Sequence, residues 1–299
     1  MNHLQEKLNA HVPVMSTETI KYLNPKSDGI YIDGTIGAGG HANQILSMLS
    51  PKGKLIGIDR DEEALKICEK RFSSFKNLVS LHHNSYDNIK KILDELGIQK
   101  VDGMLLDLGL SSLQLNSESR GFSFKKNGRI DMRFDKNQDT TAADLIKSLS
   151  ENELADIIFQ FGEERRSRRI SKAIKQSPKL LTTNDIKEAI RKSTPPHHRN
   201  KTLARVFQAI RIAVNDEIDK LIQFLKVFIN YLNIGGRLVI ISYHSLEDRL
   251  VKKTFRSLKE EKKVILLTKK PLTPQKSEIN ENNKSRSAKF RALESMVQT

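Results

Sequence analysis

The sequence predicts an α/β protein, built on a parallel sheet with helices on both faces and interrupted by an all-α insert. Over residues 29–109, short apolar runs alternate with amphipathic helical patterns, which is typical of βα units. Helical periodicity then takes over, and one apolar run returns late, at 236–242. Because that last strand needs the earlier strands beside it, an insert explains the order better than two consecutive domains do.

The expected elements follow the chain in order. Strands are expected at 29–33, 54–59, 78–82 and 101–109, with helices between them, and helical patterns then cover 142–193, 203–215 and 217–232. The run from Thr182 to Asp185 is a typical helix N-cap cluster, and Pro195 stops the helix that it begins. The polar segment 271–287 is expected to be an exposed loop. The predicted division is a core of 1–114 and 217–299, with a substrate-recognition insert at 115–216.

Composition limits the class of protein. The 299 residues are 37% hydrophobic and 29% charged, and no apolar run approaches the roughly 18 residues of a membrane span. The first residues lack the layout of a signal peptide. Cys68 is the only cysteine, which excludes an internal disulfide, and no tight metal-ligand spacing is present. We therefore expect a cytoplasmic protein without a metal or a membrane partner.

The net charge of +15 is concentrated in two zones. Residues 164–205, the insert basic zone, hold 13 Lys and Arg against 3 Asp and Glu. Residues 250–299, the C-terminal basic zone, hold 13 against 5. Two basic zones on a nearly neutral body are typical of a protein that binds a polyanion, since phosphate neutralisation supplies most non-specific affinity. The alternative is that these are solvated lysine faces.

The most informative segment is 30–41, where a short apolar run ends in Asp33 and passes through a glycine-rich turn into a helical pattern. Glycines let a backbone approach a ligand closely, so this segment predicts a nucleotide-sized seat. The spacing of Gly37, Gly39 and Ala42 also fits a dinucleotide fingerprint. Asp33 separates the two alternatives, because a carboxylate repels a pyrophosphate but suits the sulfonium and ammonium of S-adenosylmethionine.

Three predicted strands end in aspartate: Asp33, Asp59 and Asp107. Ligands of open α/β sheets bind at the carboxyl ends of the strands. Asp59 follows the glycine loop at about the 20-residue spacing of a ribose-binding acid. A single strand-end aspartate is often only a helix cap, but aspartates at three predicted strands favour a ligand site.

Two segments are candidates for the chemistry. Asp107 stands where amino-methylating enzymes hold an acid or amide followed by Pro-Pro-aromatic, although this chain lacks that tetrapeptide. At the end of the returning strand, His244 is a candidate base, a substrate partner or a structural histidine. We expect Asp107 to be the catalytic polar residue, with His244 and Ser242 next.

The insert carries two candidate RNA contacts. Arg120 lies beside Phe122 and Phe124, a combination typical of base stacking or of ordinary core packing. The arginines of 165–169 spread around a helix, where they can face phosphates or pair with the acids of 163–164.

Together these segments resemble one family closely, that of ribosomal RNA small subunit methyltransferase H, of the MraW type. The matching blocks run through the whole chain in order: 11–14, 31–41, 57–61, 102–115, 120–135, 205–211, 242–249 and 285–291. The resemblance implies a Rossmann-like S-adenosylmethionine-dependent methyltransferase core with a helical insert. It also implies methyl transfer to N4 of a cytidine in the decoding region of 16S rRNA, within the small ribosomal subunit.

The resemblance also implies site residues. It places cofactor contacts on Gly39, Gly40 and His41, with Asp59 on the ribose. Asp107 and Gln114 fall near the adenine or the methionine end, and Tyr86 falls against the adenine, where the family usually has phenylalanine. The alternatives are a DNA cytosine or adenine amino-methyltransferase, a non-catalytic RNA-binding protein on a Rossmann shell, and an NAD-dependent oxidoreductase. The oligomeric state is left open, a homodimer included.

Overall fold

The computed structural model describes residues 13–178 and 180–297. His11 and Val12 of the first family block therefore lie outside the described residues. Internal contacts divide the chain into two compact units. The core unit runs up to Gly109 and resumes at Asp219, and the helical unit is Leu110–Ile218. These divisions fall a few residues from the expected ones at 114 and 216.

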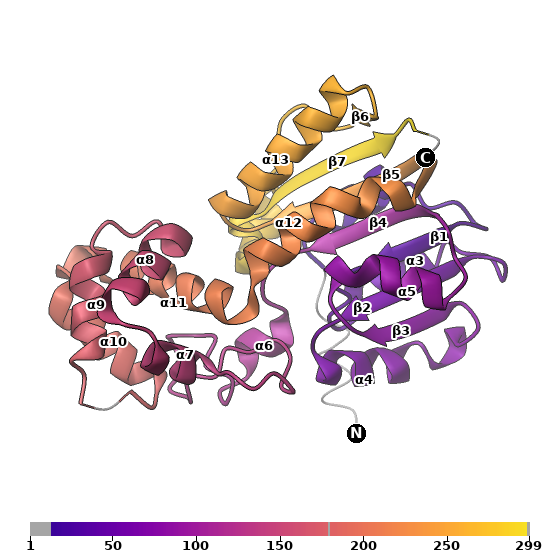
Figure 1. Ribbon diagram of the computed structural model, residues 1–299. Coiled ribbons are helices and arrows are strands. Elements are labelled where there is room, and N and C mark those ends of the chain that lie inside the picture. The colour runs from indigo at the N-terminus through magenta and orange to yellow at the C-terminus, as the bar shows by residue number, and fades with distance from the viewer. Residues whose placement is uncertain (1–12, 179, 298–299) are drawn as a thin grey trace. The chain divides into compact units, whose positions relative to one another are not determined.

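The core unit is built on a seven-stranded sheet in the order β3-β2-β1-β4-β5-β7-β6 (Figure 1). The strands are β1 (Ile30–Asp33), β2 (Lys54–Asp59), β3 (Val79–His83), β4 (Val101–Asp107), β5 (Leu232–Ser242), β6 (Val264–Leu266) and β7 (Lys289–Ser295). β3, β2, β1, β4 and β5 pair in parallel, and β7 runs antiparallel to both β5 and β6. The predicted α/β Rossmann-like class is confirmed, and the late strand does return beside β4.

Helices cover both faces of this sheet because successive side chains of a strand point to opposite faces. On β4, Leu105 packs with α2 (Ser16–Leu23), α3 (Gly40–Leu46) and α4 (Glu62–Arg71). The adjacent Leu106 packs with α5 (Ile89–Glu95), α12 (Glu217–Val227) and α13 (Ser245–Glu260). Each face therefore has its own apolar cluster, and the strands are apolar on both sides, as expected of a buried parallel sheet.

The C-terminal segment differs from the expectation. Residues 271–287 are not simply an exposed loop, because they contain α14 (Lys276–Glu281) and the 3₁₀ helix η5 (Asn283–Ser287). β6 and β7 were not predicted at all. On β7, the buried Arg291 donates to Asp248 over 2.7 Å. Part of the C-terminal basic zone is thus engaged inside the fold rather than displayed to a polyanion.

The helical unit contains α6 (Ser112–Asn116), α7 (Ala142–Ser148), α8 (Glu151–Gly162), α9 (Ser167–Lys175), α10 (Thr183–Ser193), η3 (Pro196–His198) and α11 (Arg199–Asn215). As predicted, Thr182 caps α10, in a capping box with Asp185. Buried isoleucines from α8, α9 and α10, including Ile158, Ile170 and Ile190, form the centre of this unit with Val206 of α11. Within the described residues, no helix is long and apolar enough to cross a bilayer.

Phe122 and Phe124 are packing residues, which decides between the two alternatives left by the sequence. Phe122 is buried and stacks near Phe134, and Phe124 meets Phe207 edge-on at 5.5 Å between ring centroids. Arg120 is buried as well, and its guanidinium donates to the carbonyl oxygens of 133 and 134. This segment therefore stabilises the helical unit: the Phe122 ring is buried, and the half-buried Phe124 ring is engaged with Phe207.

Candidate functional site

The three strand-end aspartates meet at one edge of the sheet. β1 lies between β2 and β4, and Asp33 is in register with Gly57 of β2 and Leu105 of β4. Asp59 and Asp107 each lie two residues further along these strands. The carboxyl ends of parallel strands face the same side, so these carboxylates lie at one edge of the sheet, where the sequence predicts a ligand site.

The glycine loop reaches this edge in a conformation that only glycine adopts without strain. Gly37 and Gly39 have φ angles of 51° and 78°. A Cβ on Gly39 would lie 2.5 Å from the ring of Phe72 and 3.2 Å from the Cys68 sulfur. Gly39 is also the N-cap of α3, so its backbone fixes where that helix begins. The loop is a preformed cradle held against α4.

Asp59 ties the loop to the end of β2. Its Oδ2 accepts from the Gly37 amide at 2.7 Å, and its Oδ1 accepts from the Asp61 amide at 2.9 Å. Burial raises the pKa of Asp59 to about 6, although these two amide donors oppose the shift. Each carboxylate oxygen has a further lone pair, so both can still accept from a pair of vicinal hydroxyls.

Asp33 is almost fully buried beneath the loop. Burial raises its pKa to about 7, while nearby His41 and the amide of Thr35 favour the charged form. The negative charges of Asp107 and Asp59 add to the rise. An anion at this place would meet three carboxylates, whereas a cation would relieve their repulsion.

His41 is the second residue of α3 and is also buried. Its Nε2 lies 3.7 Å from Oδ2 of Asp107, and neither ring nitrogen has a hydrogen-bond partner within the described part of the chain. A buried ring without a partner costs free energy unless a ligand or ordered water satisfies it. The ring therefore points to a polar ligand at this edge.

Asp107 is held by two contacts from other segments. Its backbone amide donates to the Thr35 hydroxyl at 2.7 Å, and its Oδ1 accepts from the Tyr243 hydroxyl at 2.7 Å. Burial, followed by the charge of Asp107, raises the pKa of Tyr243 well above its usual value, so Tyr243 stays a donor. The sequence prediction missed Tyr243, although it lies directly between Ser242 and His244.

Ser242 and His244 are both engaged in the local structure. The Ser242 hydroxyl donates to the carbonyl of Lys289 on the neighbouring strand β7. His244 is the N-cap of α13: its Nδ1 accepts from the Glu247 amide, and its Nε2 lies 3.1 Å from Oε1 of Glu247. These contacts favour structural roles for both residues.

The remaining predicted residues lie in two different places. Tyr86 opens the short 3₁₀ helix η2 (Tyr86–Asn88) of the core unit and packs edge-on against Phe224 with 5.7 Å between centroids. Its Cβ lies 3.1 Å from the Cβ position of Gly34, at the start of the glycine loop. Gln114 belongs to the helical unit, where its side chain accepts from the Ser111 amide in the capping box of α6.

Comparison with known proteins shows to which family the chain belongs. The family model described as the MraW methylase family matches residues 8–296. The chain belongs to the MraW methylase family. A ribosomal RNA small subunit methyltransferase H of Kosmotoga olearia is 45% identical over 297 residues, covering 97% of this chain and 99% of the relative. The protein of that name from Thermotoga neapolitana is 47% identical over 290 residues, covering 95% of each chain.

This membership confirms the resemblance seen in the sequence. A third relative of the same name, from Thermosipho africanus, is 46% identical and covers 95% of this chain and 97% of its own length. The MraW match includes the glycine loop, the three strand ends and the whole helical unit. The family match therefore includes the residues that form the carboxylate-lined cradle.

Proposed function

We propose that this protein is an S-adenosylmethionine-dependent methyltransferase that methylates N4 of a cytidine in the decoding region of 16S rRNA, acting in the bacterial cytoplasm. Its relatives carry the name ribosomal RNA small subunit methyltransferase H and match it over nearly their whole length. The observation that carries the cofactor assignment is the cradle. A glycine loop is bordered there by Asp33 and Asp107, with the unpartnered ring of His41 between helix and strand.

The residues present fit S-adenosylmethionine better than a dinucleotide. Asp33 and Asp107 suit the ammonium and sulfonium charges, and their carboxylates would repel a pyrophosphate. The Arg71 guanidinium, which also reaches the loop, is engaged with the Ala38 carbonyl at 2.9 Å. Asp59 is placed to accept from the two ribose hydroxyls, and Tyr86 offers an aromatic face for the adenine. When bound, the cofactor supplies an activated methyl group at a sulfonium centre.

Asp107 is the residue proposed to act on the cytosine amine. The lone pair of that amine is delocalised into the ring, so a carboxylate that accepts its N–H bond makes the nitrogen a better nucleophile. After transfer the nitrogen carries one proton too many, and Asp107 or water takes it. Tyr243 holds the carboxylate in place throughout, because its hydroxyl occupies Oδ1 and leaves Oδ2 for the substrate.

We propose that the helical unit is the RNA-binding part of the enzyme. It carries the insert basic zone, and its arginines and lysines are mostly exposed on α9 and α10. Unpaired bases must leave their stack to reach a methyl donor, so the RNA needs contacts beyond the target cytidine. The strong positive charge favours a nucleic acid, and the names of the relatives favour RNA over DNA.

A methylation assay tests the proposal directly. The full chain is incubated with labelled S-adenosylmethionine and one of three acceptors: unmodified small subunits, free 16S rRNA or DNA. Nucleoside mass spectrometry then identifies the product, which we expect to be N4-methylcytidine in RNA. Label in DNA, or on another base, would overturn the assignment.

Two measurements test the two rival classes of protein, a non-catalytic RNA-binding protein and an NAD-dependent oxidoreductase. Calorimetry should show S-adenosylmethionine binding, and its absence would favour a non-catalytic RNA-binding protein. A titration followed by NADH fluorescence should show no binding, and a saturable signal would favour an oxidoreductase.

A further inference from the structure

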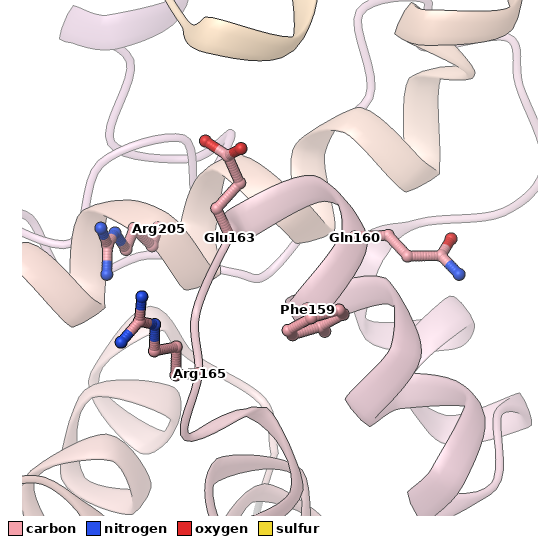
Figure 2. A pocket seen from close by; sticks show the side chains of 5 residues that line it. All are labelled: Phe159, Gln160, Glu163, Arg165 and Arg205. Carbon is pink, nitrogen blue, oxygen red and sulfur yellow. The ribbon is translucent and has the colours of Figure 1, made fainter.

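A hollow of about 620 Å³ lies on the helical unit, where α8 turns into α9. Five residues line it: Phe159, Gln160, Glu163, Arg165 and Arg205 (Figure 2). We call it the α8–α9 hollow. Its volume lies within the range of about 300–1,000 Å³ that is usual for small-ligand sites. Arg165 belongs to the arginines of 165–169, which the sequence offered as a candidate phosphate contact, and the other four lining residues were not predicted as site residues.

The turn that forms the hollow is tightly built. Gly162 lies so close to α11 that a Cβ there would be 2.7 Å from the Arg205 carbonyl oxygen. Glu163 then adopts a left-handed backbone with φ 50°, which reverses the chain at the end of α8. The Gln208 side chain donates to the Phe161 carbonyl at 2.9 Å and closes this end of α8. The walls of the hollow are therefore fixed by backbone packing.

A buried carboxylate sets the direction of Arg205. Glu164 is almost fully buried, and its Oε1 accepts from the Arg166 amide. Its Oε2 accepts from the Thr202 hydroxyl at 3.1 Å and lies 3.5 Å from the guanidinium of Arg205. Arg205 remains 37% exposed, so it keeps donors for a ligand. Glu164 thus orients one arginine while that arginine stays open to the hollow.

The chemistry of the lining is that of an unpaired nucleotide site. Phe159 is 57% exposed, an unusual state for a phenylalanine, and it offers an open ring face. Arg165 and Arg205 point their guanidinium groups into one region of the hollow (Figure 2). Two guanidiniums that converge on a hollow repel each other unless an anion lies between them, and their planar forks suit a phosphate.

We propose that the α8–α9 hollow binds one unpaired nucleotide of the RNA substrate, at a place separate from the glycine-loop site. The base stacks on Phe159, and its phosphate lies against Arg165 and Arg205. This inference rests on the proposed function for the identity of the nucleic acid as RNA. A stacked base requires an unpaired strand, so the hollow selects single-stranded over duplex RNA.

Binding of a fluorescein-labelled single-stranded RNA, measured by anisotropy, tests the hollow with the full chain. The same strand annealed to its complement serves as the duplex probe. Phe159→Ala should weaken binding of the single strand about tenfold and leave duplex binding nearly unchanged. Leu181→Ala is the matched control, because Leu181 is 68% exposed in the same unit and lies outside the hollow. It should bind both probes as the wild type does.

Salt dependence tests the phosphate contact. The slope of log affinity against log salt should become shallower by about 0.7 in Arg165→Gln, as expected for one lost contact to a single strand. Lys70→Gln removes an exposed charge from α4, outside the hollow and outside both basic zones, and should leave the slope unchanged. Circular dichroism and a melting temperature unchanged from the wild type show in every variant that the helical unit is still folded.

The outcomes separate this inference from the proposed function. If the wild type methylates small subunits but Phe159→Ala binds single-stranded RNA as tightly as Leu181→Ala, the hollow is not a nucleotide site. Equal losses with both probes would also overturn it, because stacking on Phe159 would not be involved. If the wild type methylates no RNA and the single-strand loss is still seen, the proposed reaction fails while the nucleotide site stands.

Discussion

The Tyr243 hydroxyl donates a 2.7 Å hydrogen bond to Oδ1 of Asp107, which joins the end of β5 to the end of β4. The two residues are far apart in the sequence, and the whole helical unit lies between them along the chain. Strand pairing between β4 and β5 brings them together, with Asp107 in register with Ile241. The carboxylate proposed to act on the substrate is therefore positioned by the strand that returns after the insert.

Tyr243→Phe removes that donor and keeps the ring. We expect kcat to fall about tenfold, because the carboxylate loses the bond that fixes its direction. The KM for S-adenosylmethionine and the melting temperature should change little. Steady-state kinetics with small ribosomal subunits as the acceptor measure kcat and KM separately. A rise in KM without a fall in kcat would show that Tyr243 acts in cofactor binding instead.

Asp107→Asn tests the carboxylate itself. The amide keeps the shape and can still accept from Tyr243, but it cannot take a proton. We expect turnover to fall at least about a hundredfold, as for loss of a general base. Calorimetry should show that the variant still binds S-adenosylmethionine. Near-normal turnover with normal binding would remove Asp107 from the mechanism.

Gly39→Ala tests the cradle. The alanine would be strained at a φ of 78°, and its Cβ would meet the Phe72 ring at 2.5 Å. We expect loss of S-adenosylmethionine binding and a fall in the unfolding free energy of about 2 kcal/mol. Gly97→Ala is the matched control, since Gly97 has a similar φ of 65° and nothing within 4 Å of its Cβ position. Gly97→Ala should lose only the unfolding free energy that a positive φ costs an alanine, and it should bind S-adenosylmethionine normally.

The part of the site that the sequence predicted is the part encoded locally. Asp33 and the glycines are consecutive in the chain, and Asp59 and Asp107 each end an apolar run, so topology rules alone bring them together. Tyr243 contributes through a hydroxyl whose partner lies on another strand. No local pattern distinguishes such a tyrosine from a packing residue.

There are also physical reasons why the sequence did not predict the strands β6 and β7 or the exposed ring of Phe159. β7 mixes apolar and charged residues without regular alternation, and its Arg291 is buried only because Asp248 on α13 neutralises it. Hydropathy alone assigns such a segment to the surface. In the helical unit, the sequence does not separate the buried Phe122, which lies outside the helices, from the exposed Phe159 on α8. Their difference depends on which residues of the unit pack against each ring.

The ion pair between Asp248 and Arg291 predicts that part of the C-terminal basic zone serves stability. Burial alone would raise the pKa of Asp248, but its bonds with Arg291 and Lys289 hold that pKa below the usual value. Arg291→Gln should lower the unfolding free energy by about 2 kcal/mol, because the buried Asp248 carboxylate loses its guanidinium partner and keeps only the more exposed Lys289 of the two. Urea denaturation measures this, and the exposed Lys253→Gln is the control. RNA affinity should be unchanged by Arg291→Gln, and a large loss would place Arg291 in the RNA contact.

The buried Asp33 predicts an unusual dependence of stability on pH for the ligand-free protein. Its pKa is about 7 in the fold and near 3.8 as a free side chain, so the folded state binds the extra proton between these values. The unfolding free energy should therefore fall as the pH rises from about 4 to about 7. Asp33→Asn has no proton to lose at this position, so its unfolding free energy should fall less over this pH range. At the highest pH of the range it should be more stable than the wild type. Urea denaturation across this range checks the sign, and equal declines in both proteins would contradict the burial of a protonated Asp33.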